Sequence, residues 1–209
     1  MKYKNIIFDI DGTLWDSRSI VARGYNRQLE KEGLPQFFVT EEDLRPLFGK
    51  IMTDIADILF ASLPKPYRYE LLERCFASED RMLEEDPCNV DYPGVKETIA
   101  KLAEKHNLYI VSNSQCGYPQ LCMDKLGLQS CFRDHLCHGD TGLSKGKTIR
   151  MLMERNGIAD DDVIYVGDTQ GDYEATVEAG IPFIWCAYGF GTPDGYEAKV
   201  DSFEELLSL

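Results

Sequence analysis

The sequence predicts an α/β protein with a doubly wound, mainly parallel sheet and an inserted α-helical domain. In the second half of the chain, amphipathic stretches alternate with short apolar runs at 108–111, 163–166 and 182–186. This alternation is typical of a parallel sheet covered by helices. An apolar run at 5–8 adds an N-terminal strand, whereas residues 16–88 have helical periodicity and no convincing strand.

Glycines indicate where the helices of the sheet domain end. Gly127, Gly157 and Gly180 each follow a helical stretch and precede an apolar residue. Glycine just beyond a helix favours the left-handed conformation that closes the last turn. We therefore expect one helix to stop at each of these positions.

The helical insertion has its own start signals. Thr40 and Thr53 each precede acidic residues, and we expect both to be helix N-caps. Proline-containing turns near the end of the insertion mark the return to the sheet. The predicted organisation is a core domain formed by residues 1–15 and 89–209, and a helical cap domain at 16–88.

Composition limits the possible partners. The 209-residue chain has a net charge of −14, which repels a phosphate backbone and argues against nucleic acid as a partner. Neither a signal peptide nor an apolar run long enough for a bilayer is recognisable, so we expect a cytoplasmic protein with no membrane contact, as a monomer or homodimer. The seven cysteines include no Cys-x-x-Cys pair and are expected to be buried free thiols.

Two carboxylates, Asp9 and Asp11, follow the first predicted strand. Alternation along an extended chain points both side chains the same way, while Ile10 turns into the core. Two like charges this close disfavour each other unless a cation or a shared proton compensates them. Because open α/β sheets bind ligands at the carboxyl ends of their strands, we expect a reactive site here. A calcium loop would need further oxygen ligands, where Leu14 and Trp15 stand instead.

Three further segments carry polar residues of the kind that bind an oxyanion or a cation. Two of them directly follow predicted strands, and the third opens a predicted helix. The residues concerned are Ser112, Asn113, Lys145, Lys147, Asp168 and Asp172. Each segment alone is common in loops, but together they predict acids, a hydroxyl group and a cation at one edge of the sheet.

With these segments in this order, the chain resembles the haloacid dehalogenase superfamily, in its phosphatase branch with a helical cap domain after the first motif. The pattern is most similar to that of phosphoglycolate-phosphatase-like members. The resemblance is carried by Asp9-Ile10-Asp11-Gly12-Thr13-Leu14, Ser112-Asn113, Lys145 and Gly167-Asp168 with Asp172. The lysine departs from the family pattern, in which proline often follows, because Gly146 stands here.

The resemblance implies a phosphatase that acts on a small phosphorylated metabolite through an aspartyl-phosphate. Asp9 would be the nucleophile, and Asp11 the acid that protonates the leaving alcohol and later activates water. Ser112 and Lys145 would stabilise the transferring group, with Lys147 as a rival for the lysine. Further substrate contacts are implied for three residues: Gly12, Asn113 and, in the cap domain, Lys50.

The resemblance also implies Mg²⁺ as the cofactor. Asp9, the main-chain carbonyl of Asp11 and Asp168 would hold the ion, since Mg²⁺ prefers oxygen ligands. Asp172 would be either an additional ligand or the residue that holds the waters of the ion.

Two other functions use a similar set of residues. A sugar-phosphate mutase of the β-phosphoglucomutase kind has the same two aspartates but returns the phosphoryl group to the sugar. A signalling receiver also accepts a phosphoryl group on an aspartate, although the helical insertion and Asp11 argue against it. Asp11 further favours phosphate esters over carbon–halogen bonds, because only the departing alkoxide needs a proton.

Overall fold

The computed structural model describes residues 2–209, which divide into two compact units. Unit 1 contains the chain up to Asp16 together with Val90–Leu209, and unit 2 is Ser17–Asn89. Each unit has its own hydrophobic core.

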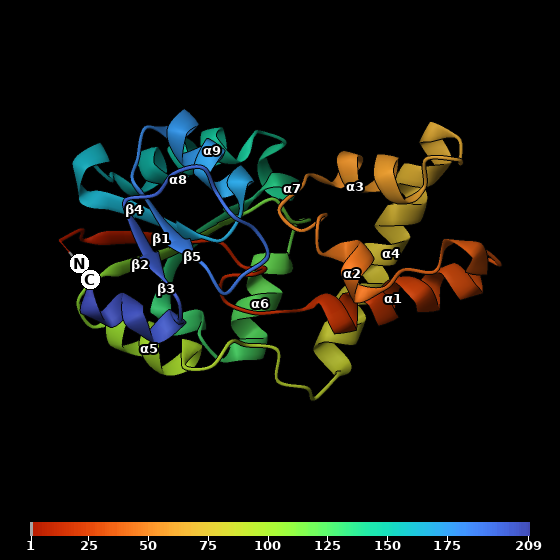
Figure 1. Cartoon of the computed structure of the whole chain (residues 1–209), viewed down its shortest axis with the longest axis horizontal. Helices are drawn as coiled ribbons and strands as arrows, with labels where there is room; N and C mark the ends of the chain where they lie inside the picture. Colours follow the sequence, from red (N-terminus) through yellow and green to blue (C-terminus); the bar gives the residue numbers. More distant parts are fainter. Residues whose placement is uncertain (1) are drawn as a thin grey trace. The chain divides into compact units, whose positions relative to one another are not determined.

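Unit 1 is built around a six-stranded sheet with the strand order β3-β2-β1-β4-β5-β6 (Figure 1). All of its neighbouring strands pair in parallel, and the order reverses direction around β1, so the sheet is doubly wound. This confirms the predicted fold class. The strands are β1 (Asn5–Phe8), β2 (Asn107–Ser112), β3 (Phe132–Cys137), β4 (Val163–Gly167), β5 (Phe183–Cys186) and β6 (Ala198–Val200).

Helices cover both faces of this sheet. Figure 1 shows α8 and α9 on one face and α5 on the other. Ile149 and Leu152 of α8 pack with Ala175 of α9 against Tyr109 and Tyr165 of the sheet. Burial on both faces explains why β1 and β4 are continuous apolar runs. The helices of unit 1 are α5 (Val95–Ala103), α6 (Tyr118–Leu126), α7 (His138–Thr141), α8 (Lys145–Asn156) and α9 (Gln170–Ala179).

The sequence did not predict the two outer strands. In β3 only the last two residues, Leu136 and Cys137, are buried, and the others include charged side chains. β6 is three residues long. Edge strands of this kind are short or charged, which limits pairing with other molecules and removes the apolar pattern that identifies inner strands.

The predicted helix ends are confirmed at all three glycines. Gly127, Gly157 and Gly180 are the C-caps of α6, α8 and α9 and have φ values of 71°, 63° and 72°. A side chain at these positions would be strained, because only glycine adopts this backbone conformation readily.

One of the two predicted N-caps is wrong. Thr40 caps α2 (Glu41–Leu44) in a capping box with Asp43, as predicted. Thr53, in contrast, lies inside α3 (Met52–Leu59), which begins after Ile51. The carbonyl of Ile51 accepts hydrogen bonds from the amides at Asp54 and Ile55, so Ile51 and not Thr53 is the N-cap residue of this helix.

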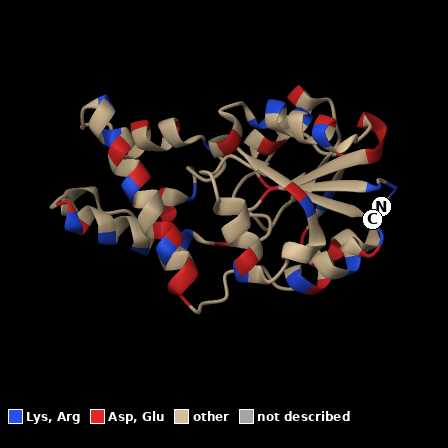
Figure 2. Ribbon diagram, turned by 180° about the vertical axis from the view of Figure 1, so that it is seen from behind, with Lys and Arg blue, Asp and Glu red and all other residues tan. Residues whose placement is uncertain are grey.

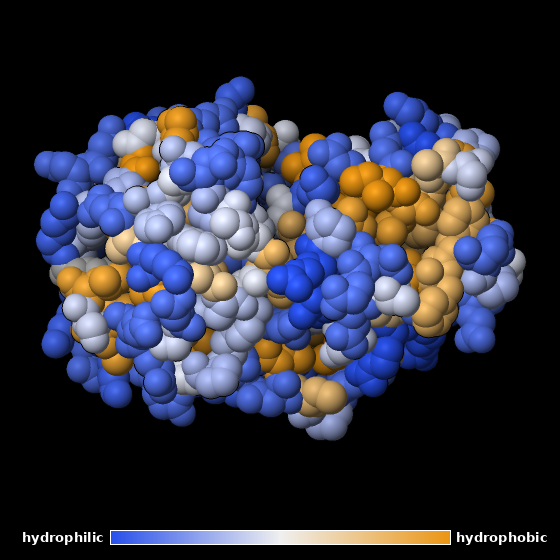
Figure 3. All heavy atoms as spheres, in the orientation of Figure 1, coloured by the Kyte–Doolittle hydropathy of each residue, from blue (hydrophilic) through white to orange (hydrophobic). Residues whose placement is uncertain are grey.

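Unit 2 contains, besides α2 and α3, the longer helices α1 (Arg18–Lys31) and α4 (Lys65–Glu85). Tyr25 of α1 packs edge-on against Phe76 of α4 within the unit's core, with ring centroids 6.1 Å apart. Charged residues of both signs are spread along α1 and α4 (Figure 2). Apolar residues gather over α3, where Ile58 is exposed (Figure 3).

Four short 3-10 segments complete the secondary structure described for residues 2–209: Pro35–Phe37, Gln129–Cys131, Asp160–Asp162 and Phe203–Ser208. None of the helices in this part of the chain has the length and apolar character needed to cross a bilayer. All seven cysteines are free thiols, but Cys88 and Cys116 are exposed, so the prediction of burial is wrong for these two.

Candidate active site

The carboxyl ends of β1, β2 and β4 bring the predicted motifs together. In the parallel register, Phe8 of β1 pairs with Ile110 of β2 and with Val166 of β4. The residues that follow on each strand therefore leave the sheet at the same edge. The backbone amide of Asp9 still donates to the Val166 carbonyl at 2.9 Å, which fixes the carboxylate at the end of the ladder.

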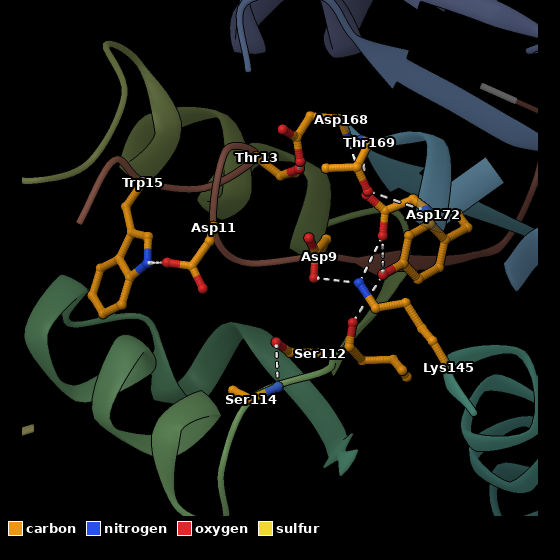
Figure 4. Close-up of polar contacts among 12 residues, drawn as sticks. Asp9, Asp11, Thr13, Trp15, Ser112, Ser114, Lys145, Asp168, Thr169 and Asp172 are labelled. Carbon is orange, nitrogen blue, oxygen red and sulfur yellow. Dashed lines mark hydrogen bonds and ion pairs between the residues drawn. The ribbon is translucent and has the colours of Figure 1, made fainter. Parts of the chain in front are cut away.

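Asp9 is paired with a buried lysine. Lys145 Nζ lies 2.9 Å from Asp9 Oδ1 and 2.6 Å from Asp172 Oδ1 (Figure 4). Lys145 is the first residue of α8, after the N-cap Ser144, and its side chain is only 4% exposed. The ring of Tyr165 faces the ammonium, with its centroid 5.8 Å from Nζ. Lys147, two positions later, is exposed.

Asp172 is held by donors from its own chain segment. Its Oδ2 accepts hydrogen bonds from the amides at Asp168 and Thr169 and from the Thr169 hydroxyl, at 3.2, 3.0 and 2.7 Å. Thr169 and Asp172 together form the capping box of α9. The other oxygen, Oδ1, accepts from Lys145, so this carboxylate links the helix start to the buried lysine.

Asp168 is fixed by the loop that follows β5. The amide of Phe190 donates to Asp168 Oδ2 at 2.7 Å, and the Thr13 hydroxyl donates to Oδ1 at 3.3 Å. Two glycines allow this close packing. A Cβ atom at Gly12 would lie 2.2 Å from Asp168 Oδ2, and one at Gly189 would lie 2.4 Å from the Gly12 carbonyl oxygen.

The buried charges do not balance. Burial, followed by the charge of Asp172, raises the pKa of Asp9 to about 7, even though Lys145 opposes the shift. Burial, with the charges of Asp172 and Asp9, also raises the pKa of Asp168 well above its ordinary value. Burial acts in the same direction on Asp172, but Lys145 and Thr169 outweigh it and lower its pKa. Asp172 is therefore the ionised partner of the lysine.

This imbalance fits a divalent cation. Asp9, Asp168 and Asp172 offer carboxylate oxygens within 4.8 Å of one another, and all three residues are buried. Three carboxylates face one ammonium group, which leaves two negative charges without a counterion when all are ionised. An oxygen-only donor set of this charge suits Mg²⁺.

Asp11 lies on the side of Asp9 that is away from Lys145, and its carboxylate points toward Trp15 (Figure 4). Trp15 Nε1 donates to Asp11 Oδ1 at 2.8 Å, and the Tyr118 hydroxyl donates to the same oxygen at 2.9 Å. Asp11 is half-buried, whereas Ile10 is fully buried, as the predicted alternation requires. The two aspartates therefore have different environments, one paired with an ammonium group and the other held by neutral donors.

The remaining predicted residues divide between the two units. Ser112 ends β2 and is buried, and its Oγ accepts a hydrogen bond from the Ser114 amide at 3.2 Å. Asn113 follows it and is half-buried. Gly12 packs against Asp168, as described above. Lys50 is exposed and belongs to unit 2, so its contact with a substrate stays a prediction.

Several residues of the site did not emerge from the sequence. The capping box of Thr169 and Asp172 has a local signature that could have been found, since a hydroxyl residue precedes an acid by three positions. Trp15, Tyr118 and Phe190 have no such signal, because their contacts with the aspartates depend on segments brought together by the fold.

Comparison with known proteins identifies the family. The sequence model of the haloacid dehalogenase-like hydrolase family matches residues 6–186. The chain belongs to this family. A protein of similar sequence is the phosphoglycolate phosphatase of Xanthomonas campestris pv. campestris, which is 28% identical over 194 residues that cover 90% of this chain and 85% of the relative.

Solved structures share the fold of this haloacid dehalogenase-like hydrolase. A predicted phosphoglycolate phosphatase from Haemophilus somnus 129pt superimposes with a TM-score of 0.83 at 23% identity, covering 100% of this chain and 98% of that one. The HAD-hydrolase YfnB from Bacillus subtilis, solved with magnesium bound, has a TM-score of 0.74 at 19% identity and covers 100% of this chain and 98% of its own. At these identities the likeness concerns the fold.

Proposed function

We propose that this haloacid dehalogenase-like hydrolase is a Mg²⁺-dependent phosphatase that cleaves a small phosphomonoester through an aspartyl-phosphate on Asp9. The observation that carries the proposal is the contrast between the two aspartates. Asp9 lies against the Lys145 ammonium, which favours the ionised form that a nucleophile needs, while Asp11 is held separately by Trp15 and Tyr118.

The first step transfers the phosphoryl group to the enzyme. An oxygen of Asp9 forms a bond to phosphorus as the bond between phosphorus and the ester oxygen breaks. Asp11 gives its proton to that oxygen, so the product leaves as a neutral alcohol. Ser112 donates to a phosphoryl oxygen, and Lys145 donates to Asp9 and to the transferring group. Both interactions stabilise negative charge in the transition state.

The second step releases phosphate. Asp11, now ionised, accepts a proton from a water molecule whose oxygen bonds to phosphorus. The bond between phosphorus and Asp9 breaks, which returns the carboxylate of Asp9 and the proton of Asp11 to their starting positions. The two steps together consume one ester and one water and yield one alcohol and one phosphate.

Asp9 and Asp168 are the residues that would hold Mg²⁺, with the main-chain carbonyl of Asp11 as a further ligand. When bound, the ion would neutralise the excess negative charge of the site and of the phosphoryl group. Asp172 accepts hydrogen bonds from the Lys145 ammonium, two main-chain amides and the Thr169 hydroxyl, which are more donors than Asp168 has, and this favours a role in holding Lys145 over direct coordination.

The names of the relatives support a choice of first substrates to test. Because similar proteins carry the name phosphoglycolate phosphatase, small phosphorylated carboxylic acids are the first candidates. The test is a panel of phosphorylated metabolites, including phosphoglycolate and sugar phosphates, incubated with the purified protein and Mg²⁺. Release of inorganic phosphate supports the proposal, conversion of one sugar phosphate to its isomer would identify a mutase instead, and no reaction with any ester contradicts both.

A further inference from the structure

Trp15 and Tyr118 donate their hydrogen bonds to one and the same oxygen of Asp11. The Nε1 of Trp15 lies 2.8 Å from Oδ1, and the hydroxyl of Tyr118 lies 2.9 Å from it. A carboxylate oxygen has two lone pairs, so these two donors occupy Oδ1 completely. The proposed function assigns a role to Asp11 but gives none to the tryptophan and the tyrosine.

Both donors are held in place by packing. Trp15 is fully buried and Tyr118 is 2% exposed. Their rings meet edge to face, with centroids 5.6 Å apart and an interplanar angle of 77°. The carbonyl of Trp15 accepts from the Gly12 amide at 2.9 Å, and Tyr118 is the first residue of α6. Rotation of the Asp11 carboxyl group would therefore break both hydrogen bonds.

We infer that Trp15 and Tyr118 are positioning residues that fix the rotation of the Asp11 carboxyl group for proton exchange with the ester oxygen. The last torsion of an aspartate is broad and has low barriers, so an unheld carboxyl group samples many orientations. Fixing Oδ1 removes this freedom and keeps the acid aligned with the breaking bond. This inference rests on the proposed function, because it concerns the acid of that reaction.

Tyr118→Phe is the direct test, because it removes the hydroxyl and keeps the ring. We expect kcat for an alkyl phosphate to fall roughly tenfold with an unchanged KM, the effect of losing one hydrogen bond that acts in the transition state. For 4-nitrophenyl phosphate, whose leaving group needs little protonation, we expect the rate of the initial nitrophenol burst, which reports the first step alone, to change by less than about twofold. Trp15→Phe should shift the same ratio of rates in the same direction.

Tyr3→Phe is the matched control. The Tyr3 hydroxyl donates to Glu197 Oε1 at 2.7 Å, so this variant also loses a hydrogen bond from a buried tyrosine to a carboxylate. It lies at the opposite end of β1 and should leave the ratio of the two rates unchanged. Thermal unfolding of all three variants shows whether each is folded.

The outcomes are distinguishable. For folded Tyr118→Phe and Trp15→Phe, a loss in the 4-nitrophenyl phosphate burst rate equal to the loss in kcat for the alkyl ester would indicate a structural role and overturn the inference. A faster reaction with the alkyl ester would also overturn it, because the two donors would then hold Asp11 away from the substrate. In both cases an active wild-type enzyme leaves the proposed function intact. A wild-type protein that releases no phosphate from any ester overturns both.

Discussion

The ammonium of Lys145 lies 2.9 Å from the carboxylate of Asp9 in a site from which solvent is almost excluded. A buried charge without a partner is strongly destabilising, so each residue depends on the other. Asp172, at 2.6 Å from the same ammonium, makes the arrangement a triad rather than a pair.

Replacing Lys145 with Met should therefore reduce both stability and activity. Removing one partner of a buried ion pair costs about 3–5 kcal/mol, and we expect a loss of this size in urea unfolding, together with a large fall in kcat. Lys147→Met is the matched control, because Lys147 is exposed two positions away on the same helix, and it should change stability by less than about 0.5 kcal/mol. Equal effects of the two variants would contradict the assignment of the lysine.

Asp9→Asn should abolish turnover without unfolding the protein. Asparagine has nearly the same shape but no ionised oxygen to attack phosphorus, and we expect kcat to fall at least about a thousandfold. Phosphate release and thermal unfolding measure the two properties separately. Mass spectrometry of wild-type protein quenched during turnover should find a phosphoryl group on the peptide that contains Asp9. A phosphoryl group on another residue would contradict the mechanism.

Asp11→Asn should slow alkyl esters more than aryl esters. The amide oxygen can still accept from Trp15 and Tyr118, but the side chain can no longer exchange a proton in the reaction. We expect a loss of about 10²–10⁴-fold in kcat for alkyl phosphates, and a much smaller loss in the phosphorylation step with 4-nitrophenyl phosphate. A rapid burst of nitrophenol followed by slow release of phosphate would show that the second step also needs Asp11.

The metal-free protein should become less stable as the pH rises from about 4 to above 7. The folded pKa of Asp9 is about 7, against an ordinary value of 3.8, so in this range the folded state binds a proton that the unfolded state has lost. The raised pKa of Asp168 acts in the same direction. Carboxylates with a lowered pKa, such as Asp172, change their contribution only at lower pH.

Mg²⁺ should remove this pH dependence, because binding favours the ionised carboxylates. Thermal unfolding in EDTA and in Mg²⁺, each at pH 5 and pH 8, is the measurement. In EDTA the unfolding temperature should be higher at pH 5, and Mg²⁺ should raise it mainly at pH 8. Activity should disappear in EDTA and return with Mg²⁺. Equal shifts by Mg²⁺ at both pH values would argue against a site formed by Asp9 and Asp168.

Gly189→Ala should weaken Mg²⁺ binding. The added Cβ would lie 2.4 Å from the Gly12 carbonyl oxygen and 2.5 Å from Asp168 Oδ2, so the loop after β5 must move away from the carboxylate. Gly171→Ala is the control, because its Cβ would meet nothing closer than 3.6 Å. Calorimetric titration with Mg²⁺ compares the two variants, and equal affinities would show that the loop does not hold Asp168 in place.

Local sequence patterns predicted the inner strands and the helix ends. Burial on both faces of the sheet gives continuous apolar runs, and helix ends with positive φ are marked by glycine. They also placed Asp9, Ser112 and Asp168 at one edge, since the carboxyl ends of parallel strands lie together. The partners of Asp11 could not be found in this way. Tyr118 is 107 positions from Asp11, and only the packing of α6 brings its hydroxyl to that carboxylate. The outer strands β3 and β6 were not predicted for a different reason: their exposed residues follow no apolar pattern.

Asp172 closes the first turn of α9 and is also the counterion of Lys145. Fraying of that turn would therefore remove one of the two carboxylate partners of Lys145. On gradual warming, catalytic competence should then be lost before the sheet melts, and amide hydrogen exchange at residues 169–172 should report the loss. Because Asp172 has both roles, the reaction depends on an ordered first turn of α9.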